Sequence, residues 1–203
     1  MDFSTVWYSS FWSFISKYLN ERFGNDWCLS PEQSLLFHVG NLTVPDQLIV
    51  HALKARNKIN QFPHHTSLLD IRARVPEPEN VTVKNNLRLF TVPCGLFHCT
   101  SRFFQQHPAD ARAVLSMIND ISEILSLLLE KGRTTIAGRL AGAFRSINQH
   151  TFADEIIKTM QPQVMTHVKK IPLKARRKSL FLNRNIHLPV DCVLCGNKCV
   201  TLF

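Results

Sequence analysis

The residues in this sequence most suited to chemistry are cysteines near its C-terminal end. Cys192, Cys195 and Cys199 are separated by gaps of two and three residues, and His187 lies just upstream. A two-residue gap lets two thiolates reach one tetrahedral Zn²⁺, which makes these four side chains the candidate metal ligands. Structural zinc sites usually take a second ligand pair from a separate hairpin or helix, whereas all four residues here lie in one short segment. We therefore expect no bound metal and no cofactor, and a small zinc protein is a minor alternative.

A basic run precedes these cysteines and is the first candidate for nucleic-acid binding. Eight of the 24 Lys and Arg residues, but only one of the 15 Asp and Glu residues, follow residue 160, so this segment carries a net charge of +7 and the rest only +2. Such a run can bind phosphates without sequence preference, although a solvated linker is the commoner explanation. The candidate residues are Lys169, Lys170, Lys174, Arg176, Arg177 and Lys178.

The nearly neutral first 160 residues offer a second basic face. Arg56, Lys58, Arg72 and Arg74 are its most plausible members, and solvated strand edges are the alternative explanation. No helix that reads DNA bases can be singled out in this part of the chain.

Motifs of the common enzyme classes are absent. The sequence holds no P-loop, no dinucleotide-binding glycine pattern, no Gly-x-Ser-x-Gly and no His-Glu-x-x-His. Cys94 and Cys99 lie beside an apolar stretch that has no basic group to stabilise a thiolate. His64 and His65 have no third metal ligand nearby in sequence, which favours a solvated loop. We therefore expect no catalytic activity.

The elements that must position these residues begin with an amphipathic helix over residues 3–23. Its aromatic face, with Trp7, Phe11 and Phe14, could dock a partner or pack on the core of the chain itself. Ser30 and Pro31 then predict a helix start, with Gln33 completing a capping box.

A small, mainly antiparallel sheet should follow, and then a helical C-terminal half, which together predict the α+β class. The expected strands are Gln47–Leu53, Leu69–Val75, Val81–Lys84 and Leu87–Val92. The expected helices are Phe97–Gln106, Pro108–Lys131, Ile136–Ile147 and Phe152–Met160. In the third of these, Gly138 and Gly142 form a smooth face suited to close helix packing. We expect a domain over residues 1–160 and a basic linker and tail over 161–203.

The composition agrees with this division and limits the class of protein. A hydrophobic content of 45%, including 14 Phe, excludes a mostly disordered chain. The sequence contains no run of 18 or more uncharged apolar residues, so we expect no membrane-spanning helix. The N-terminus lacks the basic region of a signal peptide. Six cysteines in a chain without export point to free thiols in the cytosol.

Several runs, taken in order over about residues 10–160, resemble a known family. They are Trp27–Leu36, Asn41–Leu48, His65–Asp70, Arg139–Arg145 and Ala153–Ile156. These runs resemble the N-terminal region that precedes the catalytic domain in a group of bacterial Fic proteins. That region is in turn distantly similar to the antitoxin domain of AbiEi proteins from bacterial toxin–antitoxin systems.

The resemblance implies a regulatory module without the catalytic part of the family. Fic domains transfer AMP to a protein hydroxyl with the signature His-Pro-Phe-x-x-Gly-Asn-Gly-x-x-Arg, which neither His107-Pro108 nor Gly196-Asn197 continues. The family's inhibitory helix has Ser or Thr, three further residues, Glu, and then Gly or Asn. This pattern comes closest at Thr151 and Glu155, but Ile156 stands where Gly or Asn is needed. The implied partners are DNA or a Fic-type enzyme encoded elsewhere. A membrane is not an expected partner, because the sequence has no long apolar run.

The resemblance ends near Arg184, and this suggests a frameshift. Synonymous codons can be chosen for Leu194–Val200 so that the next frame reads Met-Trp-Glu-Gln-Met-Arg, which looks like the start of the family's Fic domain. In that case the chain is truncated and its three tail cysteines are an accident of the reading frame. If the tail is genuine instead, zinc and nucleic acid are its candidate ligands. The alternative function of the chain is an interaction or dimerisation module that uses the aromatic N-terminal helix.

Overall fold

The structure is a computed structural model that describes residues 3–169. The chain divides into two compact units, one running to Asp120 and the other beginning at Ile121. Helices and strands together confirm the predicted α+β class.

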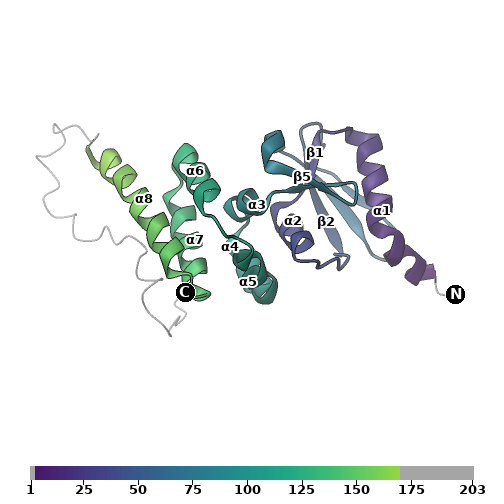
Figure 1. Ribbon diagram of the computed structural model, residues 1–203. Helices are drawn as coiled ribbons and strands as arrows, with labels where there is room; N and C mark the ends of the chain where they lie inside the picture. Colours follow the sequence, from purple (N-terminus) through teal and green to yellow (C-terminus); the bar gives the residue numbers. More distant parts are fainter. Residues whose placement is uncertain (1–2, 170–203) are drawn as a thin grey trace, which may run out of the picture. The chain divides into compact units, whose positions relative to one another are not determined.

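The first unit combines a small sheet with several helices (Figure 1). In chain order its elements are α1 (Phe3–Phe23), β1 (Trp27–Leu29), α2 (Pro31–His38), β2 (Gln47–Ala52), β3 (Ile59–Gln61), β4 (Ser67–Arg72), a 3-10 turn (Pro78–Asn80), β5 (Val81–Lys84), β6 (Leu87–Phe90), α3 (Val92–His98), α4 (Ser101–Gln106) and α5 (Pro108–Ser116).

The first two helices begin and end where local signals place them. Helix α1 ends at Gly24, whose φ of +62° is the left-handed conformation that glycine adopts without strain. Ser30 caps α2, because its Oγ accepts from the backbone N–H of Gln33 at 3.3 Å. The other half of the predicted capping box, a hydrogen bond from the N–H of Ser30 to the side chain of Gln33, does not form. The N–H of Ser30 donates instead to the carbonyl of Ile49 at 3.0 Å, so the helix cap and the sheet share one residue.

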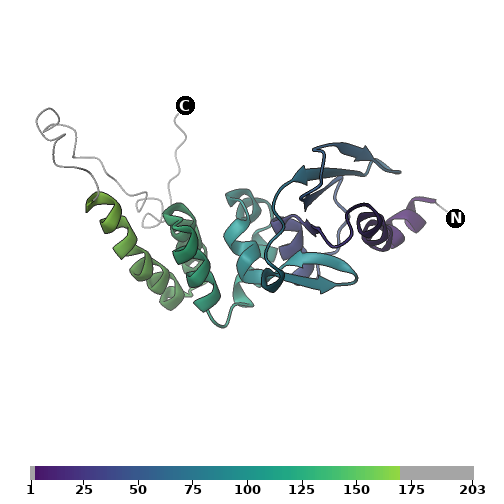
Figure 2. The ribbon, with the colours of Figure 1, turned by 90° about the horizontal axis from the view of Figure 1, so that it is seen from above.

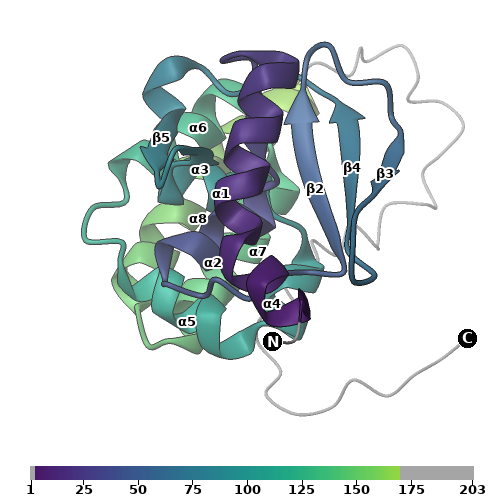
Figure 3. The same cartoon turned by 90° about the vertical axis from the view of Figure 1, so that its right-hand side faces the viewer.

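The main sheet has the order β1-β2-β4-β3, and its central pair is parallel (Figure 3). The chain leaves β2, forms β3 at the far edge and returns through a hairpin to β4, which therefore lies between them. The sequence predicted neither β1 nor β3, each three residues long, nor the parallel pairing of β2 with β4. Strands β5 and β6 form a separate antiparallel hairpin.

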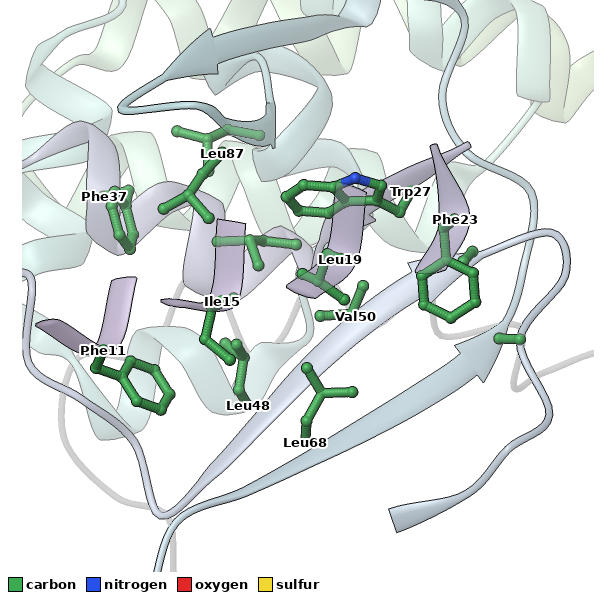
Figure 4. Packing of buried hydrophobic residues seen from close by; sticks show 14 residues of the cluster. Phe11, Ile15, Leu19, Phe23, Trp27, Phe37, Leu48, Val50, Leu68 and Leu87 are labelled. Carbon is green, nitrogen blue, oxygen red and sulfur yellow. The ribbon is translucent and has the colours of Figure 1, made fainter. Parts of the chain in front are cut away.

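One face of the main sheet packs against α1 to form the core of the unit (Figure 4). Alternate residues of β2 are buried, with Leu48 and Val50 facing the helix. From α1, the residues Phe11, Ile15 and Leu19 are fully buried against them. The same alternation on β4 points Asp70 toward α1, and this places a carboxylate inside the unit.

The helices after the sheet differ from those expected. The strand predicted over Leu87–Val92 ends at Phe90, and Pro93 lies in the first turn of α3. The helix predicted over Phe97–Gln106 is wrong, because α3 ends before Cys99 and α4 begins at Ser101. The single helix predicted over Pro108–Lys131 is also wrong.

That predicted helix is interrupted between Ser116 and Ser122, at the border of the two units. Met117 N–H bonds to the carbonyl of Val114, which tightens the end of α5. Asn119 and Asp120 follow, and short polar side chains of this kind compete with the backbone for helical hydrogen bonds. The apolar spacing continues through this interruption, which explains why it predicted one helix.

The described part of the second unit consists of α6 (Ser122–Lys131), α7 (Thr134–Ser146) and α8 (His150–Lys169). Helix α6 ends at Lys131, the residue at which the predicted helix also ends, and Gly132 follows in the left-handed conformation. Helices α7 and α8 lie side by side (Figures 1 and 2), with Phe144 and Ile156 fully buried. The prediction for Gly138 is wrong, because this residue is exposed and an added Cβ would meet nothing within 4 Å.

Candidate nucleic-acid interface

The four residues predicted as a basic face meet at one end of the main sheet. Arg56 and Lys58 lie on the loop from β2 to β3, and Arg72 ends β4, where the register pairs it with Ala52. Arg74 follows two residues later. All four side chains are exposed, and so is that of Lys54 on the same loop, which the sequence reasoning did not include. We call Lys54, Arg56, Lys58, Arg72 and Arg74 the basic rim.

Backbone hydrogen bonds hold the segments of the basic rim together. The N–H of Arg72 donates to Asn57 Oδ1 at 2.7 Å, which ties the end of β4 to the loop. The N–H of Ala73 donates to the carbonyl of Ala52 at 3.3 Å, which ties it to the end of β2. Asn57 has a φ of +56°, a left-handed conformation that Asn tolerates better than most residues. The loop is therefore a defined structure that presents its cations from a fixed backbone.

A buried carboxylate organises this loop. Asp70 is fully buried and accepts hydrogen bonds from the backbone N–H of Lys58 at 2.8 Å and of Arg56 at 3.3 Å. It also forms an ion pair with the guanidinium of Arg22 from α1. Three charge-assisted hydrogen bonds thus satisfy one buried charge. This pairing could not be predicted from sequence patterns, because Arg22 and Asp70 are far apart along the chain.

The cations of the basic rim have no acidic partners within the described residues. No ion pair there includes any of the five side chains; the negative charge of Asp70 is matched by Arg22 instead. Like charges gathered on one surface raise the local positive potential, which attracts anions and is screened by salt. The basic rim is therefore suited to a ligand with several negative charges.

Aromatic side chains lead from the flank of α1 to the basic rim. Phe14 and Tyr18 lie nearly parallel, at an interplanar angle of 22° and a centroid distance of 5.8 Å. Phe62, which follows β3, packs edge-on against both rings at 5.3 and 5.5 Å. Tyr18 Oη accepts from the guanidinium of Arg22 at 3.1 Å, so the ring next to the rim is linked to Asp70. We call Phe14, Tyr18 and Phe62 the aromatic stripe.

The three residues predicted to dock a partner have different environments. Phe11 is fully buried in the core, so its assignment to a docking surface is wrong. Trp7 is half-buried; its Nε1 donates to Thr66 Oγ1 at 3.2 Å, and its ring contacts the hairpin of its own chain. Phe14 remains accessible, with 37% of its surface exposed.

The three described cysteines are buried, and the histidine pair singled out in the sequence lies at an exposed turn. Cys28, Cys94 and Cys99 are buried, and burial raises the pKa of the Cys28 thiol far above its usual value. His64 and His65 occupy the exposed hairpin tip between β3 and β4. Asp70, the acidic residue that follows them in the sequence, is buried and paired with Arg22. Within residues 3–169 there is no group of three or more His, Cys, Asp or Glu that could hold a metal ion.

A polar depression of about 340 Å³ separates α1 from the turn between β5 and β6. Ser16 spans it by donating to the carbonyl of Asn86 at 2.9 Å. Lys17 and Glu21 line it beside this bond. We interpret the depression as the polar seam that fixes the hairpin to the helix.

The remaining candidates lie outside the described residues. These are the ligand candidates His187, Cys192, Cys195 and Cys199 and the basic residues Lys170, Lys174, Arg176, Arg177 and Lys178. Lys169 is the last residue of α8.

No helix within the described residues has the length and apolar character needed to cross a bilayer. Comparison of the chain with models of protein families, with curated proteins and with solved structures found no match.

Proposed function

We propose that this chain is a non-catalytic binding module that holds nucleic acid by its phosphates at the basic rim. The observation that carries the proposal is the gathering of five exposed cations, without acidic partners, on a backbone fixed by Asp70. A scattered set of solvated charges would not need a buried carboxylate to shape the loop that presents them.

Phosphate binding at the basic rim should make the binding constant depend on salt concentration, and the size of this dependence can be calculated. Each phosphate contact to a duplex releases counterions and contributes about −0.9 to the slope of log K against log salt concentration. If all five cations of the basic rim make such contacts, the rim contributes a slope of about −4.5. Binding should be sequence-independent, because phosphate contacts carry no base information.

The resemblance to the N-terminal region of Fic proteins and to AbiEi-type antitoxins supports a regulatory role for the module in the cytosol. In this proposal DNA is the partner of the basic rim. A Fic-type enzyme encoded elsewhere is the protein whose activity the module regulates.

Anisotropy titrations of a labelled duplex test the proposal. The full chain is used with Lys169, Lys170, Lys174, Arg176, Arg177 and Lys178 all replaced by Ala, so that phosphate binding by these six residues does not contribute to the measured affinity. In this background, Arg56→Ala with Arg74→Ala should weaken binding and reduce the salt slope by about 1.8. The matched control is Lys17→Ala with Arg112→Ala, two exposed cations of the same unit outside the rim. Equal effects of the two pairs would refute the proposal.

A second candidate function, docking of a protein partner through α1, is favoured by two exposed apolar side chains on the same side of that helix. Val6 and Phe14 are 56% and 37% exposed and lie about two turns apart. Val6→Ser with Phe14→Ser should then abolish self-association or partner association in light scattering, with little dependence on salt. Association that persists in this variant would remove the candidate.

A further inference from the structure

The aromatic stripe is linked through Arg22 and Asp70 to the loop that carries Arg56 and Lys58, and this link suggests the kind of nucleic acid that fits the two surfaces. We propose that the ligand is single-stranded, with its phosphates at the basic rim and unpaired bases stacked on the aromatic stripe. This inference rests on the function proposed above, because it assumes that the rim holds phosphates.

The continuity runs through Arg22. Phe14, Tyr18 and Arg22 follow one another at four-residue spacing, so they form one row on α1. The Arg22 guanidinium contacts both Tyr18 Oη and Asp70, and Asp70 in turn holds the backbone of Arg56 and Lys58. A strand that follows this row therefore passes from the aromatic rings toward the loop that carries the cations.

The rings are held in place before any ligand binds. Phe62 packs against Phe14 and Tyr18 at interplanar angles of 90° and 87°, which braces the pair from the β3–β4 hairpin. The centroid distance of 5.8 Å between Phe14 and Tyr18 is less than two stacking distances of about 3.4 Å, so a base cannot enter between them. A base must stack on the exposed surface of the pair, and fixed rings lose little entropy when it does.

A duplex cannot use this surface in the same way. Its bases are already stacked on one another, so rings on the flank of a helix do not reach the base faces. Single strands offer every base face, and stacking on an aromatic side chain strengthens binding roughly 5- to 150-fold per base. An aromatic row that leads into a basic surface is thus the arrangement expected for a single strand.

The test compares fluorescein-labelled 12-nucleotide oligothymidine and oligouridine with a 12-base-pair duplex at one salt concentration. The full chain with the neutralised tail should bind at least one of the single strands about tenfold more tightly than the duplex. Phe14→Leu and Tyr18→Leu keep apolar packing but remove the rings, so each should lower single-strand affinity at least fivefold while the salt slope and duplex affinity stay unchanged. Tyr18→Phe should retain single-strand affinity, because the ring remains.

Phe104→Leu is the matched control, because Phe104 is a partly buried ring of α4 in the same unit. Urea unfolding of every variant verifies that it is folded under the binding conditions. Equal affinity for single strands and duplex, or no effect of either Leu variant at the stripe, would overturn this inference while leaving phosphate binding at the rim intact. If neither the single strands nor the duplex bind in a way that depends on the basic rim, the proposed function on which this inference rests is refuted instead.

Discussion

Replacing Asp70 by Ala should be among the most destabilising changes to the first unit. The substitution removes the acceptor for the amides of Arg56 and Lys58 and the counter-ion of Arg22. A lost hydrogen bond that leaves a buried donor unpaired costs about 1–3 kcal/mol, and breaking a buried ion pair costs about 3–5 kcal/mol. Because the Arg22 side chain is 25% exposed, water can replace part of its lost partner. We therefore expect a total loss of about 3 kcal/mol, near the low end for a buried pair.

Urea unfolding followed by tryptophan fluorescence measures this change. All three tryptophans of the chain, Trp7, Trp12 and Trp27, lie in the first unit and report on its unfolding. With a denaturant slope of about 2 kcal/mol per molar urea, a loss of 3 kcal/mol lowers the midpoint by about 1.5 M. The control is Asp46→Ala at an exposed aspartate next to β2, which should change stability by less than about 0.5 kcal/mol.

The outcome also tests how Asp70 acts. Asp70→Asn keeps one acceptor oxygen for the loop amides and should lose less stability than Asp70→Ala. In a double-mutant cycle, Arg22→Met should cost less in the Asp70→Ala background than in the native chain, because its partner is already absent. A loss below about 1 kcal/mol for Asp70→Ala, or additive effects in the cycle, would refute the view that this carboxylate organises the rim.

Three further predictions concern residues outside the interface. Gly95→Ala should destabilise the first unit by about 1–3 kcal/mol in urea unfolding, because the added Cβ would lie 2.8 Å from Leu35 Cδ2; an unchanged midpoint would show that Leu35 moves aside freely. Gly138→Ala should stabilise α7 by about 1 kcal/mol, since the exposed helical position has room for a methyl group; a lower thermal midpoint would contradict this. Burial lowers the pKa of His51, with a smaller opposing effect of Glu32, so the unfolded chain takes up a proton that the folded chain resists as pH falls below about 6.5. The stability contributed by neutral His51 is thus present above that pH and is lost toward the lower folded pKa; His51→Gln should flatten this part of the pH profile, and an identical profile would exclude His51 as its source.

Local signals predicted the parts of the fold that depend on neighbouring residues. The end of α1 at Gly24 and the cap of α2 at Ser30 follow from the conformational freedom of glycine and the hydroxyl of serine. Strands β1 and β3 have three residues each, too few for a pattern, and the parallel pairing of β2 with β4 depends on where β3 lies. Apolar spacing could not reveal the end of α5, because Ile118 and Ile121 remain buried in the interruption.

The candidate site shows the same division between local and distant information. Arg56, Lys58, Arg72 and Arg74 are the basic face predicted from the sequence, and in the structure they lie at one end of the main sheet. The role of Asp70 was not predictable, because an apolar strand with one carboxylate does not reveal which cation lies opposite it. Phe11 was assigned to a surface because helical spacing alone does not tell a docking face from a core face.

Strand β3 carries a consequence for the solubility of the chain. It forms one edge of the main sheet, and an unpaired edge can recruit a strand from another molecule and start aggregation. Lys58 precedes this strand and Pro63 follows it closely, and a lysine, a proline and a length of three residues all discourage such pairing. Lys58 therefore serves as a gatekeeper of the edge as well as a cation of the rim. Removing its charge should make the chain more prone to aggregate even where no nucleic acid is present.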